Sequence, residues 1–118
     1  VARVHWQRAV TLLFMGKVPE ASGRFLHVSG MRFTYDPKAP EGSRIRAVEV
    51  GGAPLDSTRT YSVTAHDFLA AGGDGFTVFK EGGQMRDLQV APRDLVAEAL
   101  AKVRSIAPVL EGRIRSLP

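Results

Sequence analysis

One stretch in the middle of the chain, AHDFLAAGGDGF, gathers residue types that could bind a small molecule. Gly72, Gly73 and Gly75 would let a ligand come close to the backbone, because glycine has no side chain and tolerates unusual backbone angles. Asp74 only accepts hydrogen bonds when it is ionised, so it could hold a pair of hydroxyl groups. Phe68 offers an apolar face on which a ring could stack, an interaction worth about 1–3 kcal/mol per base in single-stranded nucleic-acid sites. Together these residue types favour a nucleoside as the ligand.

The same stretch also has a purely structural interpretation. In a tight turn, the glycines would take positive φ angles and Asp74 would cap backbone amides. A phosphate-binding loop fits less well, because it needs a lysine and a helix N-terminus directly after the glycines, and the following residues FTVFK supply neither. The residues alone therefore leave both a turn and a ligand site open.

The rest of the sequence gives little indication of a metal-binding site or of a catalytic nucleophile. Of the three histidines, only His66 has a neighbouring candidate ligand, Asp67, and adjacent residues on a strand point to opposite faces. No serine or threonine lies in a glycine-flanked nucleophile elbow. Asp67 and Asp74 could form a carboxylate pair, but the sequence does not give the spacing that paired acids need. We therefore expect no catalytic residue and no metal site in this chain.

The composition is that of an ordinary globular protein. The 118 residues suffice for one compact domain, and 44% of them are hydrophobic and 24% charged. The absence of cysteine excludes disulfides, thiolate nucleophiles and cysteine-ligated zinc. No apolar run is long enough to span a membrane, and the opening residues VARVHWQRAV lack the pattern of a signal peptide. Because no initiator methionine is present, we expect a processed or excised piece of a longer protein.

The formal net charge of +4 comes mainly from arginines scattered along the chain. No run of lysine and arginine carries the interleaved aromatic residues that nucleic-acid-binding surfaces use. We therefore interpret the charge as a solvated surface and rank nucleic-acid binding last among the candidate functions.

Hydrophobic periodicity predicts a helix, then several strands, then a second helix. Gly51 and Gly52 permit a tight hairpin, and Pro92 suits the first turn of the second helix. The expected helices span residues 4–15 and 92–105, and the expected strands span residues 24–30, 31–37, 44–50, 60–65 and 76–79, with a tail over 110–118. Long parallel crossovers are absent, so we predict an α+β fold, a single domain over residues 1–118 with a mixed or antiparallel sheet flanked by helices.

Four segments of the chain occur in the order found in a known family. They are GRFLHVSGMRFTYDP, SRIRAVEVGGAPLD, TYSVTAHDFLAAGGDGF and IAPVLEGRI, and they lie within residues 23–114. On these segments the chain resembles the C-terminal domain of the 5′-nucleotidase family, which includes ecto-5′-nucleotidases and bacterial periplasmic UDP-sugar hydrolases. The resemblance implies the fold of that domain, present here as a partial domain. It also shifts the interpretation of the glycine-rich stretch from a turn to a ligand site.

The resemblance implies a two-domain hydrolase of nucleotide catabolism. An N-terminal domain, absent from this chain, would hold two divalent metal ions and hydrolyse a nucleoside monophosphate or a related phosphoester. The C-terminal domain would bind the nucleoside and rotate to deliver its phosphate. Phe68 matches the residue that stacks on the base, Asp74 matches the residue that holds the ribose hydroxyls, and the glycines shape the loop. The family also implies a periplasmic or extracellular location for the whole protein.

The chain departs from the family pattern in ways that keep other functions open. The second aromatic ring of the base clamp, and the arginines and asparagines that bind the substrate, lie upstream of this sequence. His66 replaces the usual asparagine, and we interpret Phe25 as a core residue rather than as the second ring. The alternatives are a non-catalytic interaction module and a family member with another substrate, such as a sulfur-oxidation thiohydrolase. We also expect an open sheet edge that associates with another copy or with the missing half.

Overall fold

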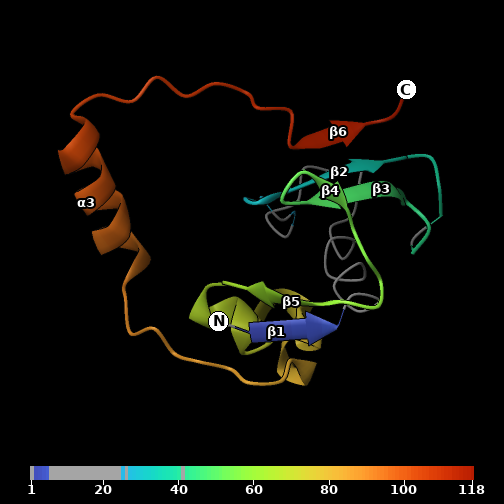
Figure 1. Ribbon diagram of the computed structural model, residues 1–118, viewed down its shortest axis with the longest axis horizontal. Coiled ribbons are helices and arrows are strands. Elements are labelled where there is room, and N and C mark those ends of the chain that lie inside the picture. Colours follow the sequence, from blue (N-terminus) through green and yellow to red (C-terminus); the bar gives the residue numbers. More distant parts are fainter. Residues whose placement is uncertain (1, 6–24, 26, 41) are drawn as a thin grey trace.

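In the part of the chain that the structure describes, two β-sheets and a twelve-residue helix are the main elements (Figure 1). The computed structural model describes residues 2–5, 25, 27–40 and 42–118. Within these ranges, no helix has the length and apolar character needed to cross a membrane.

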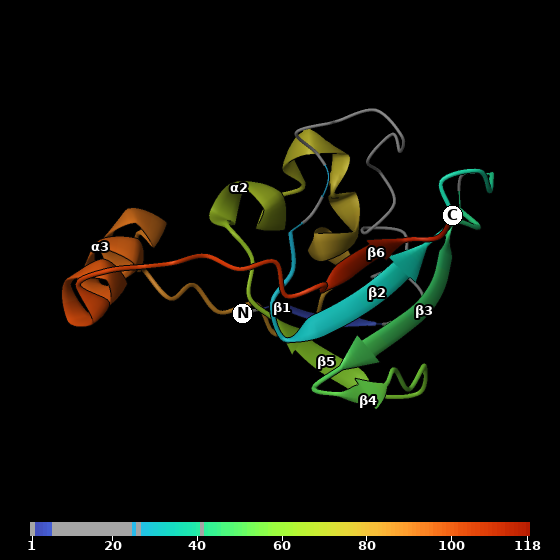
Figure 2. The ribbon, with the colours of Figure 1, turned by 90° about the horizontal axis from the view of Figure 1, so that it is seen from above.

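The larger sheet has four strands in the order β4-β3-β2-β6 (Figure 2). The strands span Met31–Tyr35 (β2), Ile45–Val50 (β3), Ala53–Pro54 (β4) and Ile114–Ser116 (β6). β3 pairs antiparallel with β2 and with β4, whereas β6 pairs in parallel with β2. The sheet is therefore mixed, and one of its outer strands comes from the far end of the sequence.

One tight turn and one longer connection, residues 36–44, join the antiparallel strands. Gly51 and Gly52, with φ angles of 60° and 83°, form the two-residue connection between β3 and β4, because this hairpin turn requires two positive φ angles. Between β2 and β3, the Asp36 carboxylate accepts hydrogen bonds from Arg46 Nη2 (2.8 Å) and from the Lys38 backbone N–H (2.9 Å). These donors, with Arg46 the largest cause, stabilise the ionised carboxylate and lower the pKa of Asp36 below its usual value.

The first hydrophobic core lies on one face of the four-stranded sheet. Phe33 is only 3% exposed and packs against partly buried side chains from three strands and the segment before β2. These side chains are Phe25, Val28, Met31, Tyr35, Ile45, Val48 and Ile114. The rings of Phe25 and Tyr35 meet edge to face, with centroids 5.9 Å apart. The interpretation of Phe25 as a core residue is confirmed.

The smaller sheet pairs β1 (Ala2–His5) with β5 (Thr60–Val63) in antiparallel register. After β5 the chain turns through a short α-helix, α2 (Asp67–Ala70), and two 3₁₀ segments, η1 (Gly73–Gly75) and η2 (Thr77–Glu81). Buried side chains at and after the end of η1 form a second core with partly buried side chains from β5, from the residues after β5 and from α2. The buried members are Phe76, Val78 and Phe79, and the partly buried ones are Val63, Ala65 and Leu69.

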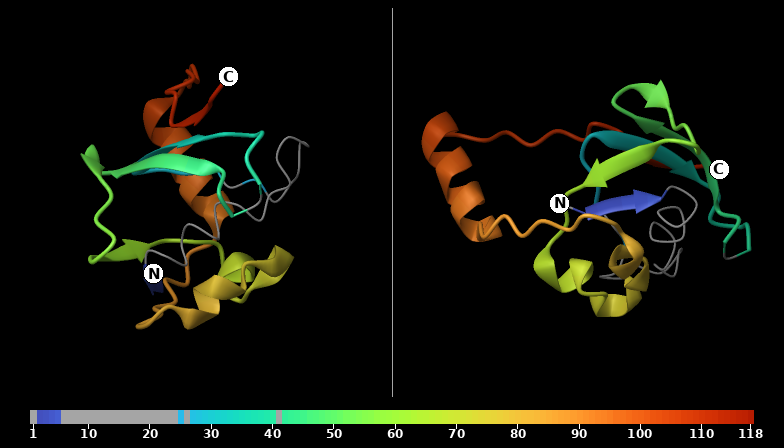
Figure 3. Two further views of the ribbon diagram at one scale, coloured as in Figure 1. Left: turned by 90° about the vertical axis from the view of Figure 1, so that its right-hand side faces the viewer. Right: turned by 60° about the horizontal axis from the view of Figure 1, so that its bottom comes forward.

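The helix α3 (Pro92–Val103) lies apart from both sheets (Figure 3). Pro92 occupies its first turn, as the sequence predicts. The apolar stripe is open to solvent, because Leu95, Val96, Leu100 and Val103 are each between 44% and 58% exposed. The radius of gyration, 15.2 Å, exceeds the roughly 13.5 Å expected for a compact chain of this length. The projecting helix therefore presents an apolar face that the described residues leave uncovered.

The predicted fold class is confirmed, since the chain is α+β with a mixed sheet and few helices. The strands predicted over residues 31–37, 44–50 and 60–65 correspond to β2, β3 and β5, and the helix over 92–105 corresponds to α3. The tight hairpin at Gly51 and Gly52 is also confirmed.

Two predictions near the C-terminal half are wrong. Residues 76–79 do not form a strand. Phe76 directly precedes η2, and residues 77–79 are its first three residues. Aromatic and β-branched residues favour strands, but a 3₁₀ turn places residues three apart on one side, and Phe76 and Phe79 are both buried by it. Residues 110–118 are not only a tail, because they contain β6. A three-residue strand is too short to show an alternating pattern, and its pairing with β2 is non-local.

Two predictions near the N-terminus also differ from the structure. Val4 and His5 belong to β1 rather than to a helix over 4–15, because they pair with Tyr61 and Thr60 of β5; residues 6–15 lie outside the described residues. Among residues 24–30, the described ones, 25 and 27–30, are irregular rather than a strand. The Val28 carbonyl instead accepts a hydrogen bond from Arg113 Nη1 at 2.5 Å.

The contrast between the second core and α3 gives a stability prediction. Phe76→Ala removes a ring that is 1% exposed, so it should lower the free energy of unfolding by about 3–5 kcal/mol. Leu100→Ala on α3 removes a side chain that is 44% exposed and should change it by no more than about 0.5 kcal/mol. Urea unfolding followed by circular dichroism measures both. Equal losses in the two variants would show that α3 is packed as tightly as the core.

Candidate functional site

The glycine-rich stretch starts at α2, whose first turn is capped by local side chains. The Phe68 N–H lies 2.8 Å from Asp67 Oδ1 and 3.3 Å from His66 Nδ1, and that nitrogen is also 2.6 Å from Asp67 Oδ1. One ring nitrogen cannot donate and accept at the same time, so the two shorter contacts favour His66 donating to Asp67 while Asp67 caps Phe68. His66 therefore has a structural role at the start of α2.

Phe68 presents its ring to solvent beside the backbone of Gly73. The residue is 54% exposed, although it is a large apolar side chain. A Cβ atom on Gly73 would lie 2.5 Å from Phe68 Cε1 and 2.6 Å from Cδ1 and Cζ, so the ring can approach this closely only because position 73 is glycine. One edge of the ring rests on the loop while the remainder stays accessible, which is the arrangement that a stacking surface requires.

Asp74 stands at the exposed tip of the loop. Its φ of 54° is in the left-handed region, which few residues other than glycine adopt. Its carboxylate makes no hydrogen bond or ion pair with any part of the chain that the structure describes. The interpretation in which Asp74 caps the backbone amides of the loop is therefore wrong, and no described residue occupies either carboxylate oxygen, so both can accept hydrogen bonds from a ligand.

A lysine that the sequence analysis did not single out lies against the other side of the loop. Gly72 has a φ of 85°, and a Cβ atom there would meet Lys80 Cε at 2.7 Å and Nζ at 3.3 Å. The aliphatic stem of Lys80 therefore packs on the Gly72 backbone, with its ammonium group at the loop surface. No sequence pattern links these two positions, because their contact depends on how η1 and η2 fold back on α2.

The buried base of the loop holds these groups in place. Phe76 follows the loop, is 1% exposed, and donates its backbone N–H to the Gly73 carbonyl at 3.1 Å. The ring of Phe79 packs beside it, with centroids 6.4 Å apart, and Leu69 of α2 contacts the same core. The exposed Phe68 and Asp74 therefore stand on a rigid base rather than on a free loop.

The five residues predicted to bind a ligand form one continuous surface. The structure brings Phe68 and Gly73 into contact, and it places Gly72, Asp74 and Gly75 in the turns that follow α2. An aromatic face, a carboxylate and a nearby ammonium group can bind a ligand by stacking and hydrogen bonding. Among the described residues, no group of three or more His, Asp and Glu side chains is arranged to hold a metal ion. The roles of the five residues remain predictions.

Comparisons with known proteins agree on one family. A family model described as 5′-nucleotidase, C-terminal domain, matches residues 11–81, more than half of the chain. A solved 5′-nucleotidase precursor from Thermus thermophilus superposes with a TM-score of 0.89 at 36% identity, over 98% of this chain and 24% of that one. The Thermus thermophilus sulfate thiohydrolase SoxB gives a TM-score of 0.57 at 32% identity, over 75% and 15% of the two chains. The 5′-nucleotidase of Diplobatis ommata is 31% identical over 101 residues, which are 79% of this chain.

These matches concern only a part of each relative. The chain covers 18% of the Diplobatis ommata protein and about a quarter of the Thermus thermophilus 5′-nucleotidase precursor. Most of each relative therefore has no counterpart among these 118 residues.

The contact between Phe68 and Gly73 can be tested in solution. Gly73→Ala should push the Phe68 ring off the loop, because the added methyl group would lie 2.5 Å from the ring. Gly83→Ala is the matched control, since no atom lies within 4 Å of the added methyl group there. NMR spectroscopy of the Phe68 ring protons should show changed shifts in the first variant and wild-type shifts in the second. Unchanged ring shifts in Gly73→Ala would show that the ring does not rest on the loop.

Proposed function

The chain belongs to the 5′-nucleotidase C-terminal domain family, and on this premise we propose that it forms the nucleoside-binding portion of a 5′-nucleotidase-type hydrolase. The observation that carries the proposal is the exposed Phe68 ring resting on Gly73, next to an Asp74 carboxylate that has no partner within the described residues. An exposed ring beside an exposed carboxylate, both held on a buried base, offers a ligand one stacking surface and one hydrogen-bond acceptor in fixed positions.

Each residue of the loop has a distinct role in this proposal. Phe68 stacks on the base, and Asp74 accepts hydrogen bonds from the ribose hydroxyls. Gly73 allows the ring to approach the backbone, while Gly72 and Gly75, both at a φ of 85°, shape the loop. Binding the nucleoside here would position its phosphate for attack elsewhere, which lowers the entropic cost of the reaction.

The proposed parent reaction is the metal-dependent hydrolysis of a nucleoside monophosphate or a related phosphoester, as part of nucleotide catabolism. The two divalent metal ions and the catalytic groups would belong to an N-terminal metallophosphoesterase domain outside these residues. The proposal assigns no catalytic residue to this chain. By analogy with the family, the whole protein would act in the periplasm or outside the cell.

Two alternative functions are compatible with the same fold. The likeness to the SoxB structure favours a family member that acts on a substrate other than a nucleotide, as the name of that thiohydrolase indicates. A non-catalytic interaction module would retain the sheets and the loop but bind no nucleoside. Both alternatives predict that nucleosides do not bind at Phe68 and Asp74.

A titration with two nucleosides separates the proposed roles of the loop residues. Adenosine should shift the NMR signals of residues 66–76, and Phe68→Ala should weaken its binding at least about fivefold, since stacking is worth about 1–3 kcal/mol. Asp74→Asn should weaken the binding of adenosine but not of 2′,3′-dideoxyadenosine, which lacks both ribose hydroxyls. Chemical-shift titration of the 118-residue chain measures all of these constants.

Phe68→Tyr is the matched control, because it keeps an aromatic face and should retain binding. If millimolar adenosine shifts no signal in the loop, or if Phe68→Ala binds as well as the wild type, the nucleoside-binding role is wrong.

We also propose that another part of the whole protein covers the apolar face of α3. The superposition on the Thermus thermophilus 5′-nucleotidase precursor includes 98% of this chain, so nearly all of α3 lies within the matched region. That relative is about four times as long, so it has ample additional polypeptide to bury the face. The uncovered stripe places four exposed large apolar side chains on one helix, and such a patch is typical of an interaction surface.

With its covering partner absent, the 118-residue chain should self-associate as its concentration rises. The double variant Val96→Glu, Leu100→Glu should remain monomeric, because both residues belong to the exposed stripe. Glu98→Ala with Lys102→Ala, which changes the ion pair outside the stripe, is the control and should behave like the wild type. Size-exclusion chromatography with light scattering gives the masses. A wild-type monomer at all concentrations would contradict the proposal.

A further inference from the structure

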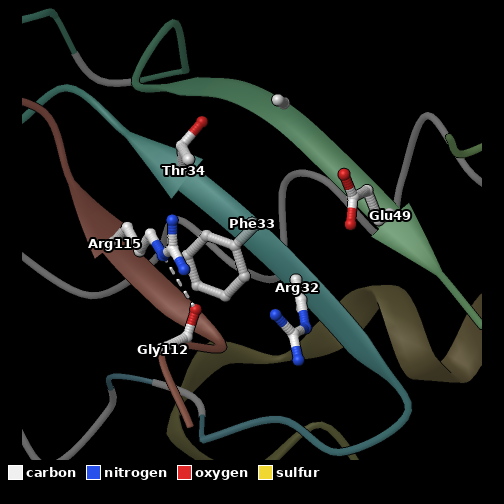
Figure 4. A pocket seen from close by; sticks show the side chains of 7 residues that line it. Arg32, Phe33, Thr34, Glu49, Gly112 and Arg115 are labelled. Atoms are coloured by element: carbon white, nitrogen blue, oxygen red, sulfur yellow. Dashed lines mark hydrogen bonds between the residues drawn. The ribbon is translucent and has the colours of Figure 1, made fainter. Parts of the chain in front are cut away.

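A hollow lies on the face of the four-stranded sheet that carries Arg32 and Thr34 (Figure 4). Both residues flank Phe33 on β2, and side chains alternate along a strand, so they point away from the core that Phe33 fills. The hollow has a volume of about 190 Å³. Figure 4 shows Arg115, Thr34, Glu49 and Arg32 arranged around it. Three strands, β3, β2 and β6, therefore contribute polar side chains to one small depression.

Arg115 is held in a fixed orientation at the edge of this hollow. Its Nε donates a hydrogen bond to the Gly112 carbonyl at 3.2 Å. A Cβ atom on Gly112 would lie 3.2 Å from both Nε and Nη2 of Arg115, so the guanidinium group lies close against the backbone of a residue without a side chain. This hydrogen bond uses one of the five donors of the guanidinium group and leaves the others available. Gly112 belongs to the EGRI sequence, which the nucleoside-binding loop does not involve.

The second arginine of the hollow has no carboxylate partner among the described residues. Some other described arginines pair with acidic side chains, as Arg46 does with Asp36 and Arg113 with Glu111. Arg32 makes no hydrogen bond or ion pair with the described residues, although Glu49 lies opposite it on β3. The hollow therefore holds two exposed guanidinium groups and one carboxylate, and the two positive charges can act together on an anion that enters it.

We propose that this hollow is a binding site for a small tetrahedral oxyanion of the phosphate class, held by Arg32 and Arg115 with the Thr34 hydroxyl as a further donor. Guanidinium groups present paired donors that match the oxygens of phosphate. Glu49 limits the total negative charge that the site accepts, which favours a single small anion over a polyanion. Because both arginines are exposed, binding is weak and falls as salt rises.

The hollow and the proposed nucleoside site involve different segments of the sequence and different β-sheets. The hollow uses β2, β3, β6 and Gly112, whereas the loop follows β5 of the smaller sheet. Inorganic phosphate carries no nucleoside and adenosine carries no phosphate, so each probe reports on one site alone. Failure of either proposal therefore leaves the other unaffected.

The test is an NMR titration of the 118-residue chain with sodium phosphate, against sodium chloride at matched ionic strength. Phosphate should give saturable shifts of the Thr34 and Gly112 amides and of the Arg32 and Arg115 Nε–H signals. Arg32→Gln and Arg115→Gln should each weaken binding by at least about fivefold, since each removes a hydrogen bond between charged groups. Arg93→Gln, at an exposed arginine of α3, is the control and should bind phosphate like the wild type.

A parallel titration with acetate distinguishes the ligand class. Acetate has one charge and two acceptor oxygens, so it should bind at least about threefold more weakly than phosphate. Equal affinities for the two anions would overturn the assignment of a tetrahedral oxyanion. Shifts that chloride reproduces, or that persist unchanged in Arg32→Gln and Arg115→Gln, would overturn the site itself.

Discussion

The burial of Phe76 beneath the glycine-rich loop is the constraint on which the candidate site depends. Its ring is almost fully removed from solvent, and its backbone N–H is bonded to Gly73, so the loop cannot move away from the smaller sheet without exposing this core. Gly73 is in turn the surface on which Phe68 rests. A hydrophobic contact with no chemistry of its own therefore sets the position of the groups that could recognise a ligand.

Burial is unevenly distributed over the chain. One core gathers around Phe33 under the four-stranded sheet, and another around Phe76 and Phe79 under the loop. In contrast, α3 contributes no buried residue. The two cores position two surfaces that carry exposed charged groups, one with Asp74 and one with Arg32 and Arg115, whereas the helix offers an apolar face. The first kind of surface suits small ligands and the second suits another polypeptide.

Sequence patterns correctly predicted the elements that are determined by residues close together in the chain. The hairpin at Gly51 and Gly52 follows from a backbone that needs positive φ, and α3 follows from its apolar stripe and Pro92. β6 could not be predicted, because its partner β2 is remote in sequence and its three residues form no pattern. The residue types of the glycine-rich stretch singled out the candidate site, and the family resemblance favoured a ligand site over a turn. The contacts of Phe68 with Gly73 and of Lys80 with Gly72 depend on tertiary folding and became apparent only in the structure.

The parallel pairing of β6 with β2 also constrains the order of folding. Residues 31–35 are synthesised long before residues 114–116, and the intervening chain includes the whole loop segment and α3. Until the later residues leave the ribosome, β2 has a free edge beside a hairpin that can already form. Closing so long a segment carries a large entropic cost, and contacts this distant in sequence form slowly. The nascent chain therefore passes through a stage with an exposed strand, in which pairing with another chain competes with completion of the sheet.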